Sequence, residues 1–207
     1  PAFPFLCLTV SGGHTQIVLC KSPLMQEIIG TTIDDAAGEA FDKSAKMLGL
    51  PYPGGPLIDK NAQLGNPLTY KFAEPQIQGL NYSFSGVKTS ILYFLQAQKK
   101  LNEQFISENM HHLCASIQHT IIKILMKKLL AASKETGIKE ICIAGGVSAN
   151  SGLRKALQEY GVKNKWNTYI PKFEYCTDNA AMIAITAYYK YLNNEFASYN
   201  DIASARN

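Results

Sequence analysis

Two adjacent glycines, Gly12 and Gly13, stand between two apolar runs and are flanked by Ser11 and Thr15. A glycine backbone lets N–H groups approach an anion closely, and the two hydroxyl groups could donate further hydrogen bonds. The segment could therefore bind a phosphate or a carboxylate. A plain hairpin turn explains the same residues equally well, because Gly-Gly turns are common between strands. A P-loop is excluded, since the sequence has no Gly-x-x-x-x-Gly-Lys-Ser/Thr motif.

Three carboxylates, Asp35, Glu39 and Asp42, follow one another at helical spacing. The spacing places them on one helix face, where they could meet ribose hydroxyls or a metal ion across a cleft. A solvated face is the commoner explanation of such a row, with ion pairs of Glu39 to Lys43 and of Asp42 to Lys46. Both interpretations stay open at this point.

A second glycine pair, Gly145 and Gly146, follows an apolar run and precedes a helical pattern. It should lie at the carboxyl edge of a sheet, where α/β proteins bind ligands, and beside the positive end of a helix. Glycines there would also admit a flat adenine ring. Asn150 could contact such a ligand, or it could serve only as the N-cap of the helix.

Asp178 begins the last predicted helix, and capping of that helix is a sufficient explanation for it. A role as a metal ligand would need partners from elsewhere. The histidines His111, His112 and His119 have no carboxylate at ligand spacing, so they are predicted to be surface or packing residues.

No residue has the features of a covalent nucleophile. Cys7, Cys114 and Cys142 lie in apolar runs, where burial should raise the pKa of a thiol. The five cysteines include no Cys-x-x-Cys pair, which favours a reducing cytoplasm over metal or redox chemistry.

The composition bounds the class of protein. A chain of 207 residues with 46% hydrophobic and 17% charged residues can bury a normal core. Its formal charge of +4 is compatible with nucleic acid but is common among proteins that do not bind it. No apolar run reaches the roughly 18 residues that a membrane span needs. The chain begins with Pro1 rather than Met, so we expect a piece of a longer protein.

The elements that must position these residues follow from apolar periodicity and turn residues. The helix that follows Asp34 and Asp35 should be capped by them, and it should end at Gly49. Strands are predicted over residues 5–10, 15–20, 25–33, 141–144 and 168–170, and helices over 36–48, 57–64, 85–99, 107–136, 149–160 and 178–193.

This order reads βββα, then βα and βα, once the helices of residues 55–137 are set aside as an insertion. It predicts an α/β fold with a mixed five-stranded sheet, the ribonuclease H-like half of the actin-like ATPase (ASKHA) fold. The half-domain should cover residues 1–196, followed by a tail of residues 197–207. The chain has room for only one such half, so the N-terminal half-domain is expected to be absent.

Six segments carry a resemblance to a known family. In order they are residues 11–16, 34–43, 52–56, 83–89, 145–150 and 176–184. Together they resemble the TsaD/Gcp family of tRNA adenosine threonylcarbamoyltransferases, formerly called glycoproteases, over nearly the whole chain.

The resemblance implies transfer of a threonylcarbamoyl group from threonylcarbamoyl-AMP to the exocyclic amine of the tRNA adenosine beside the anticodon. It implies that the phosphate and acyl part are held by Thr9, Val10, Ser11, Gly12 and Gly13. It further implies that Asp42 and Gly55 hold the ribose, that Asn150 holds the adenosine side, and that Asp178 is a ligand of iron or zinc.

The resemblance also implies cofactors and partners. These are a nucleotide (threonylcarbamoyl-AMP or ATP/ADP), one divalent metal ion in the full-length protein, tRNA, a smaller paralogous TsaB-like subunit, a TsaE-like ATPase and the synthase that supplies the adenylate. No membrane is involved, and the location is cytoplasmic. The family's His-x-x-x-His pair lies upstream of the Ser-Gly-Gly-His segment and has no counterpart here, so this chain is expected to be inactive alone and to bind no metal tightly.

Three other classes compete with this interpretation. A sugar or carboxylate kinase of the same fold would need different sequences around Asp42 and Asn150. A metalloprotease would need a His-Glu-x-x-His motif, which is missing. A non-catalytic scaffold paralogue is disfavoured because Asp42, Gly55, Asn150 and Asp178 are retained.

Overall fold

The computed structural model describes residues 1–202, and its centre is one five-stranded sheet. The strand order is β3-β2-β1-β4-β5. β1 pairs antiparallel with β2, and β2 with β3, whereas β1, β4 and β5 run parallel. The mixed five-stranded sheet is therefore confirmed. The strands are β1 (Phe5–Val10), β2 (Thr15–Ser22), β3 (Met25–Thr31), β4 (Glu140–Ala144) and β5 (Asn167–Tyr169).

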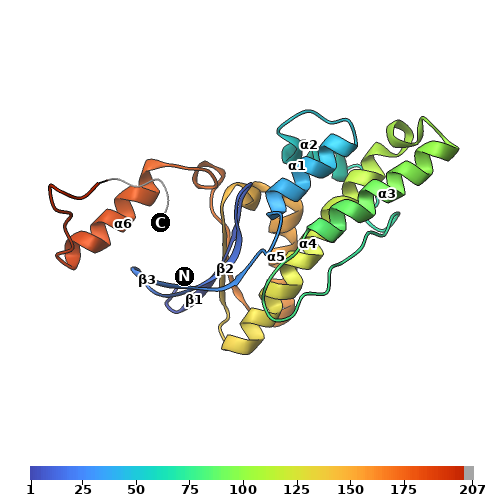
Figure 1. The fold of residues 1–207 in the computed structure, drawn as a ribbon. Coiled ribbons are helices and arrows are strands. Elements are labelled where there is room, and N and C mark those ends of the chain that lie inside the picture. The colour runs from blue at the N-terminus through green and yellow to red at the C-terminus, as the bar shows by residue number, and fades with distance from the viewer. Residues whose placement is uncertain (203–207) are drawn as a thin grey trace.

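The two faces of the sheet differ in burial because side chains alternate along each strand. In β1, Leu6, Leu8 and Val10 are fully buried, while Cys7 and Thr9 on the opposite face are half-buried. The fully buried residues belong to the same apolar cluster as residues of the helices. Figure 1 shows the helices other than α6 on that side of the sheet.

Six α-helices and two short 3-10 helices complete the described part of the chain. They are α1 (Ala37–Met47), α2 (Gly54–Ala62), α3 (Ser85–Leu101), α4 (Phe105–Thr136), α5 (Ser151–Asn164), α6 (Ala180–Leu192), η1 (Gly146–Ala149) and η2 (Phe173–Tyr175). The 32-residue α4 runs through the middle of the core, where Ile121, Leu125 and Leu129 are fully buried. The helices predicted as an insertion over residues 55–137 therefore share one core with the sheet.

The last helix, α6, differs from the other α-helices because none of its 13 residues is buried. In Figure 1 it stands apart from the other helices, with the sheet between them. Of the predicted tail over 197–207, residues 197–202 form no helix or strand, and residues 203–207 lie outside the described residues.

The predicted capping of α1 by Asp34 and Asp35 is wrong. The residue before α1 is Ala36, which makes no side-chain cap, and the Ala37 N–H instead donates to Thr15 Oγ1 at 2.8 Å. Asp34 accepts hydrogen bonds from the Ser83 hydroxyl and the Phe84 N–H, ahead of α3. The cap of α1 thus comes from β2, a contact that no local rule can detect.

The predicted glycine ends are confirmed for two helices. Gly49 has a φ angle of +80° one residue after the C-cap of α1, and Gly137 has +72° directly after α4, a conformation that favours glycine. All six predicted helices are present with shifted bounds. The largest shifts are the start of α2, at Gly54 instead of residue 57, and the end of α5, at Asn164 instead of residue 160.

Candidate functional site

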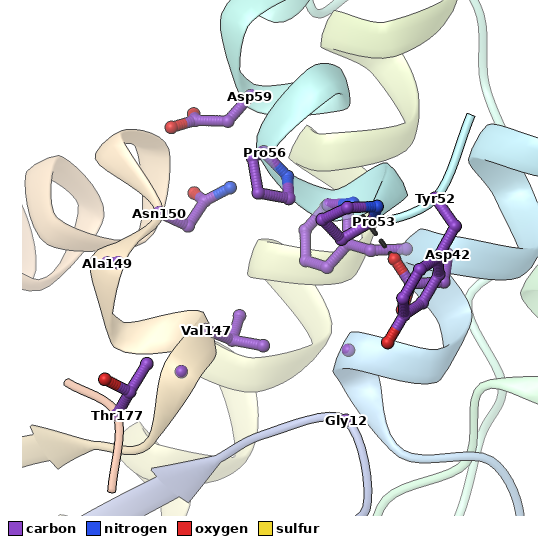
Figure 2. A pocket seen from close by; sticks show the side chains of 14 residues that line it. Gly12, Asp42, Tyr52, Pro53, Pro56, Asp59, Val147, Ala149, Asn150 and Thr177 are labelled. Carbon is purple, nitrogen blue, oxygen red and sulfur yellow. Dashed lines mark hydrogen bonds between the residues drawn. The ribbon is translucent and has the colours of Figure 1, made fainter. Parts of the chain in front are cut away.

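A cavity of about 480 Å³ lies where α1 and the start of α2 face η1 and the start of α5. Figure 2 shows its walls: Asp42, Tyr52 and Pro53 on one side, and Val147, Ala149 and Asn150 on the other. Its volume falls in the range of small-molecule sites. Four of the predicted site residues line it, from four separate segments of the chain: Gly12, Asp42, Gly55 and Asn150.

Asp42 belongs to α1 but fixes the beginning of α2. Its Oδ1 accepts hydrogen bonds from the Gly54 N–H at 2.8 Å and the Gly55 N–H at 3.1 Å. The first N–H groups of a helix have no partner within the helix, so this carboxylate satisfies two of them. It explains why α2 starts at Gly54, and it brings Asp42 and Gly55 to one wall of the cavity. Their role in holding a ribose stays a prediction.

Asn150 holds the opposite wall through two hydrogen bonds. Its Oδ1 accepts from the Leu153 N–H at 2.9 Å, which confirms the predicted N-cap of α5. Its Nδ2 donates to Gln118 Oε1 of α4 at 2.7 Å. Asn150 is nearly buried and lines the cavity as well, so capping and ligand contact are compatible at this residue.

Asp59 is a cavity residue that the sequence analysis missed. It lies on α2 and accepts hydrogen bonds from the Ser151 N–H at 2.9 Å and the Ser151 hydroxyl at 2.7 Å. These bonds join α2 to the first turn of α5. Figure 2 shows Asp59 projecting from α2 at the cavity. Its position four residues after Gly55, on the same face of a helix, is the signal that could have identified it.

The first glycine turn contributes less than its residue types suggested. The Ser11 hydroxyl accepts from the Gly13 N–H at 3.3 Å and the His14 N–H at 3.0 Å, and the Thr15 hydroxyl accepts from α1. Both hydroxyls accept hydrogen bonds within the fold, but a hydroxyl that accepts can still donate its own proton, so their role as donors to a ligand stays a prediction. Gly12 reaches the cavity, whereas Thr9, Val10, Ser11 and Gly13 do not line it.

The second glycine turn divides into two roles. Gly145 has φ +89°, and a Cβ there would lie 2.4 Å from the Val10 carbonyl oxygen, so only glycine fits between β1 and η1. Gly146 lines the cavity, and a Cβ on it would meet nothing within 4 Å. The predicted open space for a flat ring is thus present beside Gly146.

Asp178 is exposed and follows Thr177, which lines the cavity, but it does not cap α6. The cap is Asn179, whose side chain accepts from the Met182 N–H at 3.2 Å. The capping interpretation of Asp178 is therefore wrong. Among residues 1–202, no three His, Cys, Asp or Glu side chains lie close enough to hold a metal ion, so the described residues do not form a metal site by themselves. The role of Asp178 as a metal ligand stays a prediction.

The three carboxylates predicted to share one helix face have different partners: Asp35, which precedes α1, and Glu39 pair with a lysine, whereas Asp42 caps α2. Lys43 forms ion pairs with Asp35 and Glu39, both at 2.8 Å, while Asp42 points to α2. Burial raises the pKa of Asp35, but hydrogen bonds and charges from Lys43 and Lys88 outweigh it, so the pKa of Asp35 is lowered. The predicted pair of Glu39 with Lys43 is confirmed.

The cysteines agree in part with their predicted pKa directions. Burial raises the pKa of Cys114 to about 12. Cys7 and Cys142 are neighbours in register on β1 and β4, and their hydrogen bond, together with burial, raises the pKa of Cys142. The same hydrogen bond lowers the pKa of Cys7, so the expected rise for Cys7 is wrong: it ignored a neighbouring thiol.

Comparison with known proteins shows which proteins share this fold and which share this sequence. The crystal structure of full-length HypF in its phosphate- and nucleotide-bound form superposes with a TM-score of 0.71 over 93% of this chain and 34% of that chain, at 13% identity. The family described as TsaD, tRNA N6-adenosine threonylcarbamoyltransferase, matches residues 1–185.

Two relatives named tRNA N6-adenosine threonylcarbamoyltransferase are similar over the whole chain. The protein of Christiangramia forsetii is 59% identical over 206 residues, and that of Riemerella anatipestifer is 61% identical over 206 residues. This chain covers 61% and 60% of their lengths, respectively.

The sheet order and the cavity at its carboxyl edge define a half-domain of the actin-like ATPase fold. The sequence identifies it further: the chain belongs to the TsaD family. Across residues 1–202, no helix combines the length and the apolar character that a membrane crossing requires.

Proposed function

We propose that this chain forms the nucleotide-binding part of an enzyme that transfers a threonylcarbamoyl group from threonylcarbamoyl-AMP to the exocyclic amine of the tRNA adenosine beside the anticodon. The observation that carries the proposal is the convergence of Gly12, Asp42, Gly55 and Asn150 on one cavity. These residues are up to 138 positions apart (150 − 12), and the family resemblance had assigned all four to one ligand.

The cavity wall suits an adenosine. Phe41, Tyr52 and Pro53 on one side and Val147 on the other offer apolar surfaces for a purine ring. Asp42 uses Oδ1 for the start of α2. Its Oδ2 has no hydrogen bond within the described residues and could accept a hydrogen bond from a ribose hydroxyl.

The charges in the cavity favour an adenylate over a nucleoside triphosphate. Among the described residues that line it, Asp42 and Asp59 are the charged ones, and none is Lys or Arg. Like charges repel, so these carboxylates oppose a triphosphate more than an acyl-adenylate, whose single phosphate carries one negative charge. An acyl transfer enzyme fits this lining better than a kinase does.

The chemistry proposed for these residues is positioning. Holding the adenylate in one orientation would present its carbamoyl carbon to the attacking adenosine amine. As the carbon–nitrogen bond forms, the carbon–oxygen bond to phosphate breaks, AMP leaves with that electron pair, and the amine loses a proton to solvent. A divalent metal ion, if supplied with further ligands, would stabilise charge on the adenylate oxygens. Asp178 is the proposed carboxylate ligand of that metal ion.

We propose tRNA, a TsaB-like subunit and a TsaE-like ATPase as partners, and the cytoplasm as the location.

The binding test uses calorimetry on the 207-residue chain with a non-hydrolysable acyl-sulfamate analogue of the adenylate. We expect binding that Asp42→Ala weakens by about tenfold or more, since one lost hydrogen bond to a charged group corresponds to such a factor. Glu159→Gln, an exposed carboxylate of α5 outside the cavity, is the matched control and should bind normally.

The transfer test uses the longest natural polypeptide that contains this sequence, with its partners, and measures adenylate-dependent labelling of tRNA. Phosphorylation of a small metabolite by ATP without tRNA labelling would favour the kinase and refute the proposal.

A further inference from the structure

Arg154 on α5 joins two segments that border the cavity, although it does not line the cavity itself. Its Nε donates to the Ser148 carbonyl oxygen in η1 at 2.8 Å. Its Nη2 donates to the Pro171 carbonyl oxygen at 2.7 Å and contacts Cys176 Sγ at 3.3 Å. One guanidinium therefore connects η1 to both ends of the loop of residues 171–176.

The aromatic ring of Phe173 completes this contact. The guanidinium carbon of Arg154 lies 4.0 Å from the ring centroid, the arrangement of a cation–π interaction. Phe173 is otherwise largely exposed. In contrast to the exposed loop around it, Cys176 is only 3% exposed beneath the guanidinium.

The contacts made at position 154 need an arginine and could not be made by a lysine. Only two of the 20 basic residues of the chain are arginines, Arg154 and Arg206. A lysine ammonium cannot present a planar face to an aromatic ring while donating to two carbonyl oxygens on different segments. The contacts of Arg154 require what arginine alone provides.

We propose that Arg154 is a positioning residue that holds the 171–176 loop against η1 and thereby places Thr177 in the cavity wall, on the same side as Val147. Thr177 follows Cys176 directly, and both Thr177 and Val147 line the cavity. If the loop were released, this wall would open without any change in the residues that contact the ligand. The inference rests on the proposed nucleotide site for its consequence, but the contact itself can be tested without a ligand.

The first experiment measures the rate at which a thiol reagent labels Cys176 in the 207-residue chain, read peptide by peptide by mass spectrometry. Arg154→Met keeps a similar length and removes the hydrogen bonds and the charge. We expect Cys176 to be labelled about tenfold faster or more, as for the loss of one charge-assisted hydrogen bond, because local opening of the loop becomes easier. Cys114, fully buried in α4, is the internal control and should keep its rate.

The comparison variants separate positioning from general stability. Lys155→Met removes a positive charge from the next residue of α5, whose side chain is exposed, and should leave Cys176 protected. Arg154→Lys should give an intermediate rate. If Arg154→Met fails to fold, Phe173→Leu loosens the same loop from its exposed side and should also accelerate labelling.

The second experiment measures binding of the acyl-sulfamate adenylate analogue. We expect Arg154→Met to weaken binding by about tenfold, and the analogue to slow labelling of Cys176 in the wild type more than in the variant. An unchanged labelling rate of Cys176 in Arg154→Met would refute the claim that Arg154 holds the 171–176 loop in place. Faster labelling with unchanged affinity would overturn the positioning role. No binding by the wild type would instead refute the proposed nucleotide site, while the labelling rates would still decide the contact.

Discussion

At the scale of single residues, Ser148 is unusual because its hydroxyl is buried without a hydrogen-bond partner in the described part of the chain. Burial of an unpaired polar group costs about 1–3 kcal/mol. We therefore expect Ser148→Ala to leave the free energy of unfolding unchanged or to raise it by up to about 1 kcal/mol in urea denaturation.

Ser133→Ala is the matched control for this prediction. The Ser133 hydroxyl is also buried, but it donates to the Ile138 carbonyl oxygen at 2.6 Å. Its removal should lower the free energy of unfolding by about 1 kcal/mol. A larger loss in Ser148→Ala than in Ser133→Ala would show that the Ser148 hydroxyl has a partner in solution.

Asp178 offers a second test at this scale, in the longest natural polypeptide that contains the chain. Because Asn179 caps α6, Asp178→Asn should not change the melting temperature in metal-free buffer. If Asp178 is a metal ligand, metal content and transfer rate should fall together, since an amide binds iron or zinc more weakly than a carboxylate. Glu174→Gln, a nearby exposed carboxylate, is the control. Stoichiometric metal and near-normal transfer in Asp178→Asn would refute the assignment.

Four residues that the sequence marked as site candidates line one cavity: Gly12, Asp42, Gly55 and Asn150. Their hydrogen bonds within the fold were harder to predict than their positions. The bonds of Asp59 to Ser151 and of Arg154 to the 171–176 loop could not be found in this way, because each joins a helix residue to another element. The spacing of Asp59 and Arg154 within their own helices carries no signal of those partners.

At the scale of elements, the helix starts show where local rules succeed and fail. Asn150 stands directly before α5 and caps it, as a local rule predicts. Thr15 caps α1 and Asp42 caps α2 from other elements, at separations of 22 and 12 residues along the chain. The elements themselves follow from periodicity, but their starting residues depend on tertiary contacts.

Asp35 gives a pH test of how α1 is held to α3. Its carboxylate pairs with Lys43 at 2.8 Å and with Lys88 of α3 at 3.5 Å, and its pKa is lowered in the folded state. A lowered folded pKa gives stability that is present above the unfolded value of about 3.9 and is lost as the pH falls through the folded pKa.

We therefore expect Asp35→Asn to lower the free energy of unfolding at pH 6 by up to about 1 kcal/mol, with the difference from wild type shrinking below about pH 4. Denaturant titrations at both pH values would measure it. Glu27→Gln breaks an exposed pair with Lys21 and should have little effect at either pH. A difference that persists undiminished at pH 2 would contradict the assignment of this stability to the ionised carboxylate.

At the scale of the whole molecule, one apolar core joins the sheet to α1 through α5, and the cavity lies at the edge of that core. The opposite face of β1 is half-buried, and α6 contributes nothing to the core. Apolar residues of α6 such as Ile183 and Leu192 are 74% and 55% exposed. The sheet and α1 to α5 thus share one packed core, and α6 lies outside that core.

This separation predicts that truncation after Asn179 leaves the stability of the body formed by the sheet and α1 to α5 almost unchanged. Deleting α6 removes no buried side chain, so the free energy of unfolding in urea should stay within about 0.5 kcal/mol of the full chain. Leu157→Ala on α5, where the side chain is fully buried, should by contrast lose about 2–5 kcal/mol. A loss of several kcal/mol on truncation would mean that α6 packs against the body in solution, because only burial of its apolar side chains could provide a contribution of that size.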